Sequence, residues 1–202
     1  MTNDKGQSPP LILIVSTYLT MPFRKNRYFW VIAAISVIVD QLTKYLVVQN
    51  FALYESWSVI PDIFHLTYVL NTGAAFSLFS QGGVWLRWLS LAVSLGLMGL
   101  AWFGSRLKPI EQLGYGFILG GALGNGIDRF FNDCIVNGKQ LTCVVDFLEF
   151  PIVKFPILVD FRHIRLAPFP VFNFADVFIN LGIICLLIIS FRQSPPTTHS
   201  NR

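Results

Sequence analysis

Two aspartates in the second half of this chain, Asp146 in "VVDF" and Asp176 in "FNFAD", are each surrounded by apolar residues. Two carboxylates that lie close together cannot both ionise, so such a pair shares one proton. Its ionised member can take a proton from water, while its protonated member polarises a peptide carbonyl. This is aspartic peptidase chemistry and requires no metal, cofactor or nucleophilic side chain. Asp146 and Asp176 are therefore the candidate catalytic pair.

Other polar residues interrupt apolar sequence elsewhere in the chain. Asp40 and Lys44 are spaced i, i+4, which places them on one face of a helix, and Asn125, Asp128 and Arg129 have a similar helical spacing. Charged groups at membrane depth are costly unless paired, and they often mark functional sites. Each also has a structural interpretation, because Asp40 with Lys44 can form an ion pair and Asp128 with Arg129 can hold helices together.

The same ambiguity applies to the candidate pair. Asn173 or Asp176 can cap a helix, and Asp146 can be an ordinary loop acid. The joint occurrence of two acids in apolar sequence beside a polar cluster favours function.

Other chemistries have little support in this sequence. His65 and His163 have no Ser or Cys motif beside them, and no Cys/His cluster with metal-ligand spacing is present. We therefore expect neither a catalytic triad nor a zinc site. Cys134 and Cys143 are close enough in sequence to pair in an oxidising compartment, and we predict a disulfide between them. Cys185 lies in an apolar run and resembles a small buried hydrophobe.

The composition is that of a membrane protein. Of the 202 residues, 53% are hydrophobic and only 13% are charged, and the mean hydropathy is +0.57. A soluble domain normally carries about a quarter charged residues. The net charge of +4 is small, and no basic stripe is interleaved with aromatic residues, so we expect no nucleic-acid partner.

Hydropathy predicts an all-α membrane protein with four transmembrane helices. The first would be about 31 Å long, enough to cross a hydrocarbon core of about 30 Å. The third carries Gly116, Gly120 and Gly124 at a spacing that lets helices pack closely. Two long loops would form a small extracytoplasmic β or irregular subregion. The four helices are expected at about residues 28–48, 84–103, 113–131 and 171–191.

The distribution of basic residues predicts the orientation. Lys and Arg mark both termini and the short loop 104–112, whereas the long loop 49–83 has neither. By the positive-inside rule, both termini are cytoplasmic and the long loops 49–83 and 132–170 face outward. Asp146, Asp176 and the other polar residues then converge on the outer membrane boundary.

This orientation also divides the chain. We expect an N-terminal cytoplasmic extension over residues 1–27, a four-helix membrane domain over 28–191 and a cytoplasmic tail over 192–202. Met1–Pro22 is expected to be poorly ordered or interfacial, and Met21 could be the true start. The end of the tail is polar, contains prolines and is expected to be disordered.

Five sequence blocks resemble those of bacterial lipoprotein signal peptidase, or signal peptidase II. They occur in the family order, and together they are specific, although each alone is modest. The blocks are "VDQLTKYLV" (Val39–Val47), "NTGAAFSLF" (Asn71–Phe79), "GGALGNGIDR" (Gly120–Arg129), "VVDF" (Val144–Phe147) and "FNFAD" (Phe172–Asp176).

The resemblance implies a four-helix inner-membrane aspartic endopeptidase that acts without a cofactor. Such an enzyme removes signal peptides from diacylglyceryl-modified prolipoproteins by cutting before the lipidated cysteine. Asp146 and Asp176 would be the catalytic pair. We further expect contacts with membrane lipids and a monomer. The other matching positions, which would bind substrate or shape the site, are Asp40, Lys44, Asn71, Gly73, Asn125, Asp128, Arg129, Asn173 and Ala175.

The segment Leu148–Pro170 is longer than the family linker. Its proline spacing argues against a long helix and favours short strands or irregular backbone. Its mixture of apolar and cationic residues suits an interfacial flap, or a loop without a role.

Two other classes of protein remain as alternatives. A small ion- or proton-coupled carrier or channel would place its acids near the midplane and often shows inverted repeats. A structural membrane protein would use the polar cluster only to hold its helices together.

Overall fold

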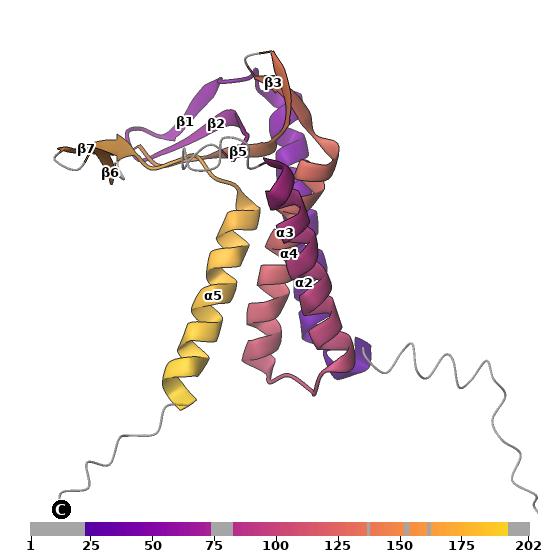
Figure 1. Ribbon diagram of the computed structural model, residues 1–202. Coiled ribbons are helices and arrows are strands. Elements are labelled where there is room, and N and C mark those ends of the chain that lie inside the picture. Colours follow the sequence, from indigo (N-terminus) through magenta and orange to yellow (C-terminus); the bar gives the residue numbers. More distant parts are fainter. Residues whose placement is uncertain (1–22, 74–82, 137, 152–153, 161–162, 194–202) are drawn as a thin grey trace, which may run out of the picture.

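A computed structural model describes residues 23–73, 83–136, 138–151, 154–160 and 163–193. The expected extension Met1–Pro22, the alternative start Met21 and most of the tail lie outside these residues. Four long helices run alternately up and down, with small β-sheets across one end of the bundle (Figure 1). The start of α2 and the end of α5 lie at the opposite end. The helices are α2 (Arg27–Asn50), α3 (Gly83–Phe103), α4 (Pro109–Phe131) and α5 (Phe174–Gln193).

Local capping explains where the helices depart from the expected boundaries. α4 begins at Pro109 rather than 113, because proline suits the first helical position and the Glu111 carboxylate accepts a hydrogen bond from the Lys108 N–H at 2.7 Å. α5 begins at Phe174 rather than 171. The backbone of Phe172 instead pairs with Leu148, with N···O distances of 2.8 and 3.1 Å.

The expected β subregion is present as three small antiparallel sheets. Residues distant in sequence meet in the first sheet, where Asn71 pairs with Val144 and Val69 with Asp146. The segment after Leu148 forms a hairpin rather than a helix, as its prolines indicated, and this hairpin extends past the top of α5 (Figure 1). The sheets are β1 (Ser56–Ile60), β2 (Phe64–Asn71) and β5 (Val144–Glu149); β3 (Asp133–Val136) and β4 (Lys139–Thr142); and β6 (Lys154–Asp160) and β7 (His163–Pro168).

The predicted disulfide between Cys134 and Cys143 is present. It joins β3 to the residue directly before β5, so it ties the end of α4 to the strand that carries Asp146. Among the described residues, Cys185 is the free cysteine.

Glycines allow α4 to pack closely against two helices. A Cβ added at Gly120 would overlap the Ser36 side chain on α2, and one added at Gly121 would overlap the Ala175 carbonyl on α5. The expected ridge of Gly116, Gly120 and Gly124 therefore packs against α2, while another glycine face packs against α5. Because both neighbours approach the backbone of α4, polar residues from three helices can reach one another.

Three of the described helices are long and apolar enough to cross a membrane: α2, α3 over Trp85–Phe103 and α5 over Phe174–Arg192. Their outward surfaces expose large apolar side chains such as Leu42, Leu95 and Ile184. α4 has the length of a span, but it carries many glycines and polar residues and is not among these three.

The glycine packing predicts an unequal response to added methyl groups. Gly120→Ala and Gly121→Ala should each lower the free energy of unfolding by about 1–3 kcal/mol, because the new Cβ overlaps a neighbouring helix. Gly96→Ala and Gly99→Ala on α3 are the controls, since a Cβ there meets nothing within 4 Å. These controls should be neutral, or more stable by up to about 1 kcal/mol. Thermal unfolding in detergent measures the difference, and equal effects in both pairs would contradict the packing.

Candidate active site

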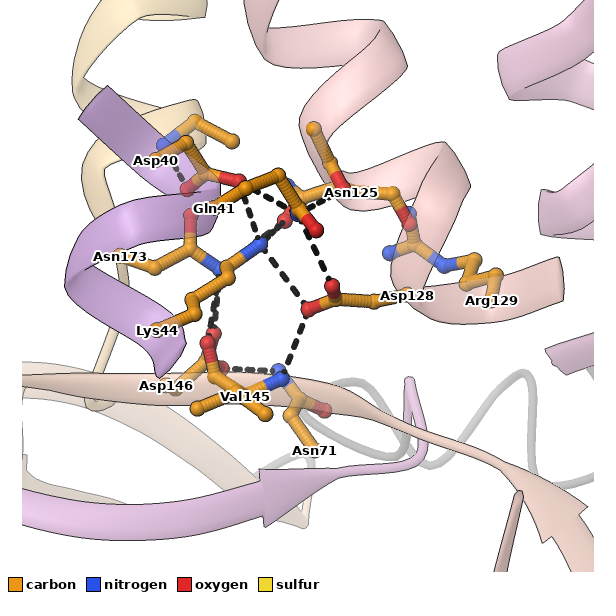
Figure 2. Close-up of polar contacts among 12 residues, drawn as sticks. Asp40, Gln41, Lys44, Asn71, Asn125, Asp128, Arg129, Val145, Asp146 and Asn173 are labelled. Carbon is orange, nitrogen blue, oxygen red and sulfur yellow. Dashed lines mark hydrogen bonds and ion pairs between the residues drawn. The ribbon is translucent and has the colours of Figure 1, made fainter. Parts of the chain in front are cut away.

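A buried lysine lies at the centre of the polar cluster. The Lys44 ammonium is 2.8 Å from Asp40 Oδ2 and 3.0 Å from Asp128 Oδ2, and it donates a hydrogen bond to Asn125 Oδ1 at 3.0 Å (Figure 2). All four side chains are buried. The ion pair between Asp40 and Lys44 that the i, i+4 spacing suggested is therefore present. It extends to α4 rather than remaining within α2.

The two carboxylates beside Lys44 also position backbone. Asp40 Oδ1 accepts a hydrogen bond from the Ala175 N–H at 2.8 Å, which anchors the first turn of α5. Asp128 Oδ2 accepts one from the Val145 N–H at 3.0 Å, which anchors β5 one residue before Asp146. Hydrogen bonds to ionised groups are stronger than neutral ones. The triad of charges therefore fixes both elements that carry the candidate pair.

Gln41 belongs to this network, although the sequence analysis did not include it. Its Nε2 lies 3.1 Å from Asp128 Oδ1, 3.1 Å from the Gly124 carbonyl and 3.2 Å from Asp40 Oδ2. In the sequence, the one feature that indicated a role for Gln41 was its position between Asp40 and Lys44 in "VDQLTK". It shares no i, i+4 relation with Asp40, and only the crossing of α2 and α4 brings it to Asp128.

Asp146 is 2% exposed and is held by two amide side chains. Asn173 donates to its Oδ1 at 2.7 Å and Asn71 donates to its Oδ2 at 2.8 Å. The side-chain carbonyl of Asn71 accepts the Gly73 N–H at 2.8 Å. Gly73 has a φ of 83°, in the left-handed region that favours glycine, so this turn fixes the orientation of the Asn71 amide.

Asp176 lies in the first turn of α5 and caps that helix together with Asn173. The Asn173 side-chain oxygen accepts the Asp176 N–H at 3.1 Å, and Asp176 Oδ2 accepts the Asn173 N–H at 3.3 Å. Its other oxygen accepts a hydrogen bond from Asn125 at 2.9 Å. The capping interpretation is therefore right, yet it does not exclude function, since Asn173 also donates to Asp146.

The two asparagines connect the candidate pair. Asn173 Nδ2 lies within 2.9 Å of both Asn125 Oδ1 and Asp146 Oδ1, and Asn125 Nδ2 donates to Asp176. Burial, together with the negative charge of Asp176, raises the pKa of Asp146 from 3.8 to about 7, although the amides of Asn71 and Asn173 oppose this shift. The Asp146 carboxyl is therefore partly protonated near neutral pH.

Arg129 lies at the edge of the cluster. Its guanidinium is half-buried, makes a 3.4 Å contact with the Asn125 carbonyl, and interacts electrostatically with Asp176, Asp146 and Asp128. Arg87 of α3 donates to the Arg129 carbonyl at 2.7 Å and fastens α3 to the end of α4. The structure thus brings every candidate residue to one end of the bundle, with Gly73 and Arg129 at the periphery. Within the described residues, no group of three His, Cys, Asp or Glu is arranged to hold a metal ion.

Comparison with known proteins defines the class. A solved bacterial membrane enzyme at 2.3 Å resolution superposes with a TM-score of 0.63 and 25% identity, covering 85% of this chain and 92% of that one. The sequence pattern of the family described as Signal peptidase (SPase) II matches residues 32–192. The fold is that of a membrane enzyme.

Named relatives of this chain agree with the family match. The lipoprotein signal peptidase of Gloeothece citriformis is 53% identical over 180 residues, which cover 89% of this chain and 96% of that protein. That of Microcystis aeruginosa is 55% identical over 170 residues, which cover 84% and 95%. The chain belongs to the signal peptidase II family, and it is therefore a membrane protease.

The buried charges predict a large effect of removing the cation. Lys44→Met should lower the free energy of unfolding by about 3–5 kcal/mol, because it leaves Asp40 and Asp128 buried without their partner. Arg27→Met on the same helix is the control, since Arg27 is exposed and its loss should matter by less than about 0.5 kcal/mol. The additional change Asp40→Asn should restore part of the loss. Thermal unfolding of the purified variants measures these effects, and equal losses for both Met variants would contradict the role of Lys44.

Proposed function

We propose that Asp146 and Asp176 are the catalytic pair of an aspartic endopeptidase that removes signal peptides from prolipoproteins. By analogy with the family, the cut would fall directly before the diacylglyceryl-modified cysteine. The observation that carries the proposal is the bridge of Asn125 and Asn173 between the two carboxylates, combined with a pKa of about 7 for Asp146. With this pKa, Asp146 carries a proton for part of the time in the neutral range, which is the proton that the pair would use.

The shared proton suits peptide hydrolysis. The ionised member of the pair accepts a proton from a water molecule as that water attacks the scissile carbonyl, and the protonated member donates a hydrogen bond to the carbonyl oxygen. When the C–N bond breaks, the pair returns a proton to the leaving amine. Asp146 is fixed by two amides and Asp176 by the helix cap, so neither carboxylate needs to reorganise during the reaction.

The arrangement in the membrane is also proposed. α4 would be a fourth span, giving a membrane domain over residues 28–191, with the extension 1–27 and the tail 192–202 in the cytoplasm. The support is the alternation of the four helices and the basic residues at one end of the bundle. The sheets and the candidate pair would then face outward from the bacterial inner membrane. There the lipid of the substrate stays in the bilayer while water reaches the bond to be cleaved.

The substrates would be prolipoproteins with a diacylglyceryl cysteine, and the chain would act as a monomer in contact with membrane lipids. Incubation of the purified protein with a lipid-modified prolipoprotein is the direct test. A carrier, a channel or a purely structural protein would leave this substrate intact.

The catalytic pair predicts selective loss of turnover. Asp146→Asn and Asp176→Asn should each reduce kcat by at least about 1,000-fold, because an amide can neither share the proton nor accept one from water. Asp62→Asn is the matched control: Asp62 is exposed and has a φ of 60°, a conformation that asparagine also tolerates. Mass spectrometry of the cleaved signal peptide measures kcat. Substantial turnover by either purified, folded variant refutes the pair.

The raised pKa of Asp146 predicts two dependences on pH. The ratio kcat/KM should fall as pH rises through about 7, because the pair then loses its shared proton. Folding stability should follow the same direction, since the folded protein binds this proton more tightly than the unfolded chain. That stability is present below about pH 3.8 and is lost as pH rises through about 7.

The stability change has a clear control. A pKa difference of this size corresponds to at most about 4 kcal/mol. Asp146→Asn removes the ionisable group, so its unfolding temperature should decline less between pH 5 and pH 8 than that of the unaltered chain. Identical declines in the two proteins would exclude the raised pKa.

A further inference from the structure

A second concave site lies beside the candidate pair without including it. A groove of about 450 Å³ runs between the last turns of α2, the sheet of β1, β2 and β5, and the first residue of α5. Its walls include Leu46 and Val47 of α2, Leu66 of β2, Leu148 of β5 and Phe174. This volume is within the usual range of ligand pockets, about 300–1,000 Å³.

The groove is separate from the site of hydrolysis. Its walls include neither candidate aspartate. The three asparagines that donate hydrogen bonds to those carboxylates, Asn71, Asn125 and Asn173, do not line it either. The groove therefore does not include the side chains that would carry out the hydrolysis.

The lining of the groove favours a hydrocarbon ligand over a polar one. Two of its lining residues, Thr43 and Asn50, carry hydroxyl or amide groups, and both turn these groups to the backbone of their own helix. Thr43 Oγ1 donates to the Val39 carbonyl at 2.8 Å, and Asn50 Nδ2 donates to the Leu46 carbonyl at 2.7 Å. A polar ligand would leave its hydrogen-bonding groups unpaired against this lining, at a cost of about 1–3 kcal/mol each.

The groove is continuous with the membrane-facing surface of α2. Leu46 lines it and is still 49% exposed, and the neighbouring Leu42 and Tyr45 are exposed on the same helix. α2 is about 36 Å long, so its last turns lie at the boundary of a hydrocarbon core of about 30 Å. The bilayer can therefore supply a hydrocarbon chain directly from the side.

An aromatic rim marks the interfacial end of the groove. The rings of Phe51 and Trp57 contact each other at a tilt of 36°, with centroids 4.4 Å apart, and both residues line the groove. Trp57 Nε1 donates to Glu55 Oε1 at 2.7 Å, so the indole combines an apolar ring with a satisfied polar edge. This is the behaviour of tryptophan at a membrane–water interface.

We propose that this groove binds one acyl chain of a bilayer phospholipid, with the head group beside Trp57. The chain would pack against Leu148 and Phe174, which are close in sequence to Asp146 and Asn173 respectively. Water does not fill apolar cavities readily, and dispersion contacts with the chain would replace those that an open groove lacks. The bound lipid would therefore contact β5 at Leu148 and α5 at Phe174.

Photolabelling tests the site directly. The full chain is reconstituted in vesicles of 1-palmitoyl-2-oleoylphosphatidylglycerol that contain a fraction of phosphatidylglycerol with a diazirine on one acyl chain. After irradiation, adducts are located by peptide mass spectrometry. We expect adducts at Leu66 or Leu148, on strands outside the four helices, in addition to adducts on exposed positions of α5 such as Ile184.

Groove-filling variants provide the control. Thr43→Trp and, from the opposite wall, Leu66→Trp should each reduce adducts on β2 and β5 by at least about fivefold, because the new ring occupies the space of the chain. Leu42→Trp, one residue from Thr43 on the membrane-facing surface, should leave these adducts unchanged. Adducts on α5 should be equal in all variants, which verifies insertion and folding.

Two results overturn the proposal. One is the absence of adducts on β2 and β5 while α5 is labelled. The other is their displacement by a synthetic peptide with a diacylglyceryl cysteine, which would assign the groove to the substrate. The readout is an adduct rather than turnover, so the outcome is independent of whether Asp146 and Asp176 carry out the proposed hydrolysis.

Discussion

The placement of the catalytic candidates depends on one buried cation. Lys44 forms ion pairs with both Asp40 and Asp128, and each of these carboxylates in turn accepts a backbone N–H from an element that carries one candidate aspartate. Desolvating three charges is costly, so the cluster is weak evidence of stability by itself. Its structural contribution is to fix the positions of α5 and β5 relative to α2 and α4. The carboxylates specify which residue of α5 and which residue of β5 lie beside α2 and α4, an accuracy that apolar packing of smooth helical surfaces would not provide.

The close packing of α4 makes this electrostatic arrangement possible. A Cβ at Gly124 would lie 2.5 Å from Asp40 Oδ2, so a larger residue there would separate α2 from α4 and move Asp40 out of its place. Gly121 has the same function toward α5, where it leaves room for the backbone of Ala175. The charge pairing between helices therefore depends on the close approach of their backbones. The glycines shorten the distances between helices, and the short polar side chains of Asn125 and Asp128 then span them.

Much of the fold and of the site could be predicted from the sequence, because hydropathy and spacing are local signals. The four helices lie close to their expected positions, and the candidate residues meet at one end of the bundle as the alternation of helices required. The parts that could not be predicted depend on contacts between distant segments. The backbone pairing of Phe172 with Leu148 moves the start of α5 to a later residue than expected. The pairing of β2 with β5 brings Asn71 to Asp146. The place of Gln41 in the network could not be predicted, because its partner Asp128 lies on another helix.

The two candidate carboxylates differ in their surroundings, and this difference bears on how such a pair can work. Asp146 lies on a strand, is fully buried and is held by the amides of two asparagines, so its raised pKa of about 7 results from burial and from the charge of Asp176 acting against those amides. Asp176 is less buried and lies at the N-terminus of a helix, where the helix dipole favours a negative charge. Asn173 binds to both, since its side chain donates to Asp146 and accepts from the backbone of Asp176. One amide side chain therefore links the Asp146 carboxylate to the backbone of the first turn of α5, which carries Asp176. The two acids therefore lie near enough for the charge of Asp176 to raise the pKa of Asp146, and Asp176 is the one that is more exposed to solvent.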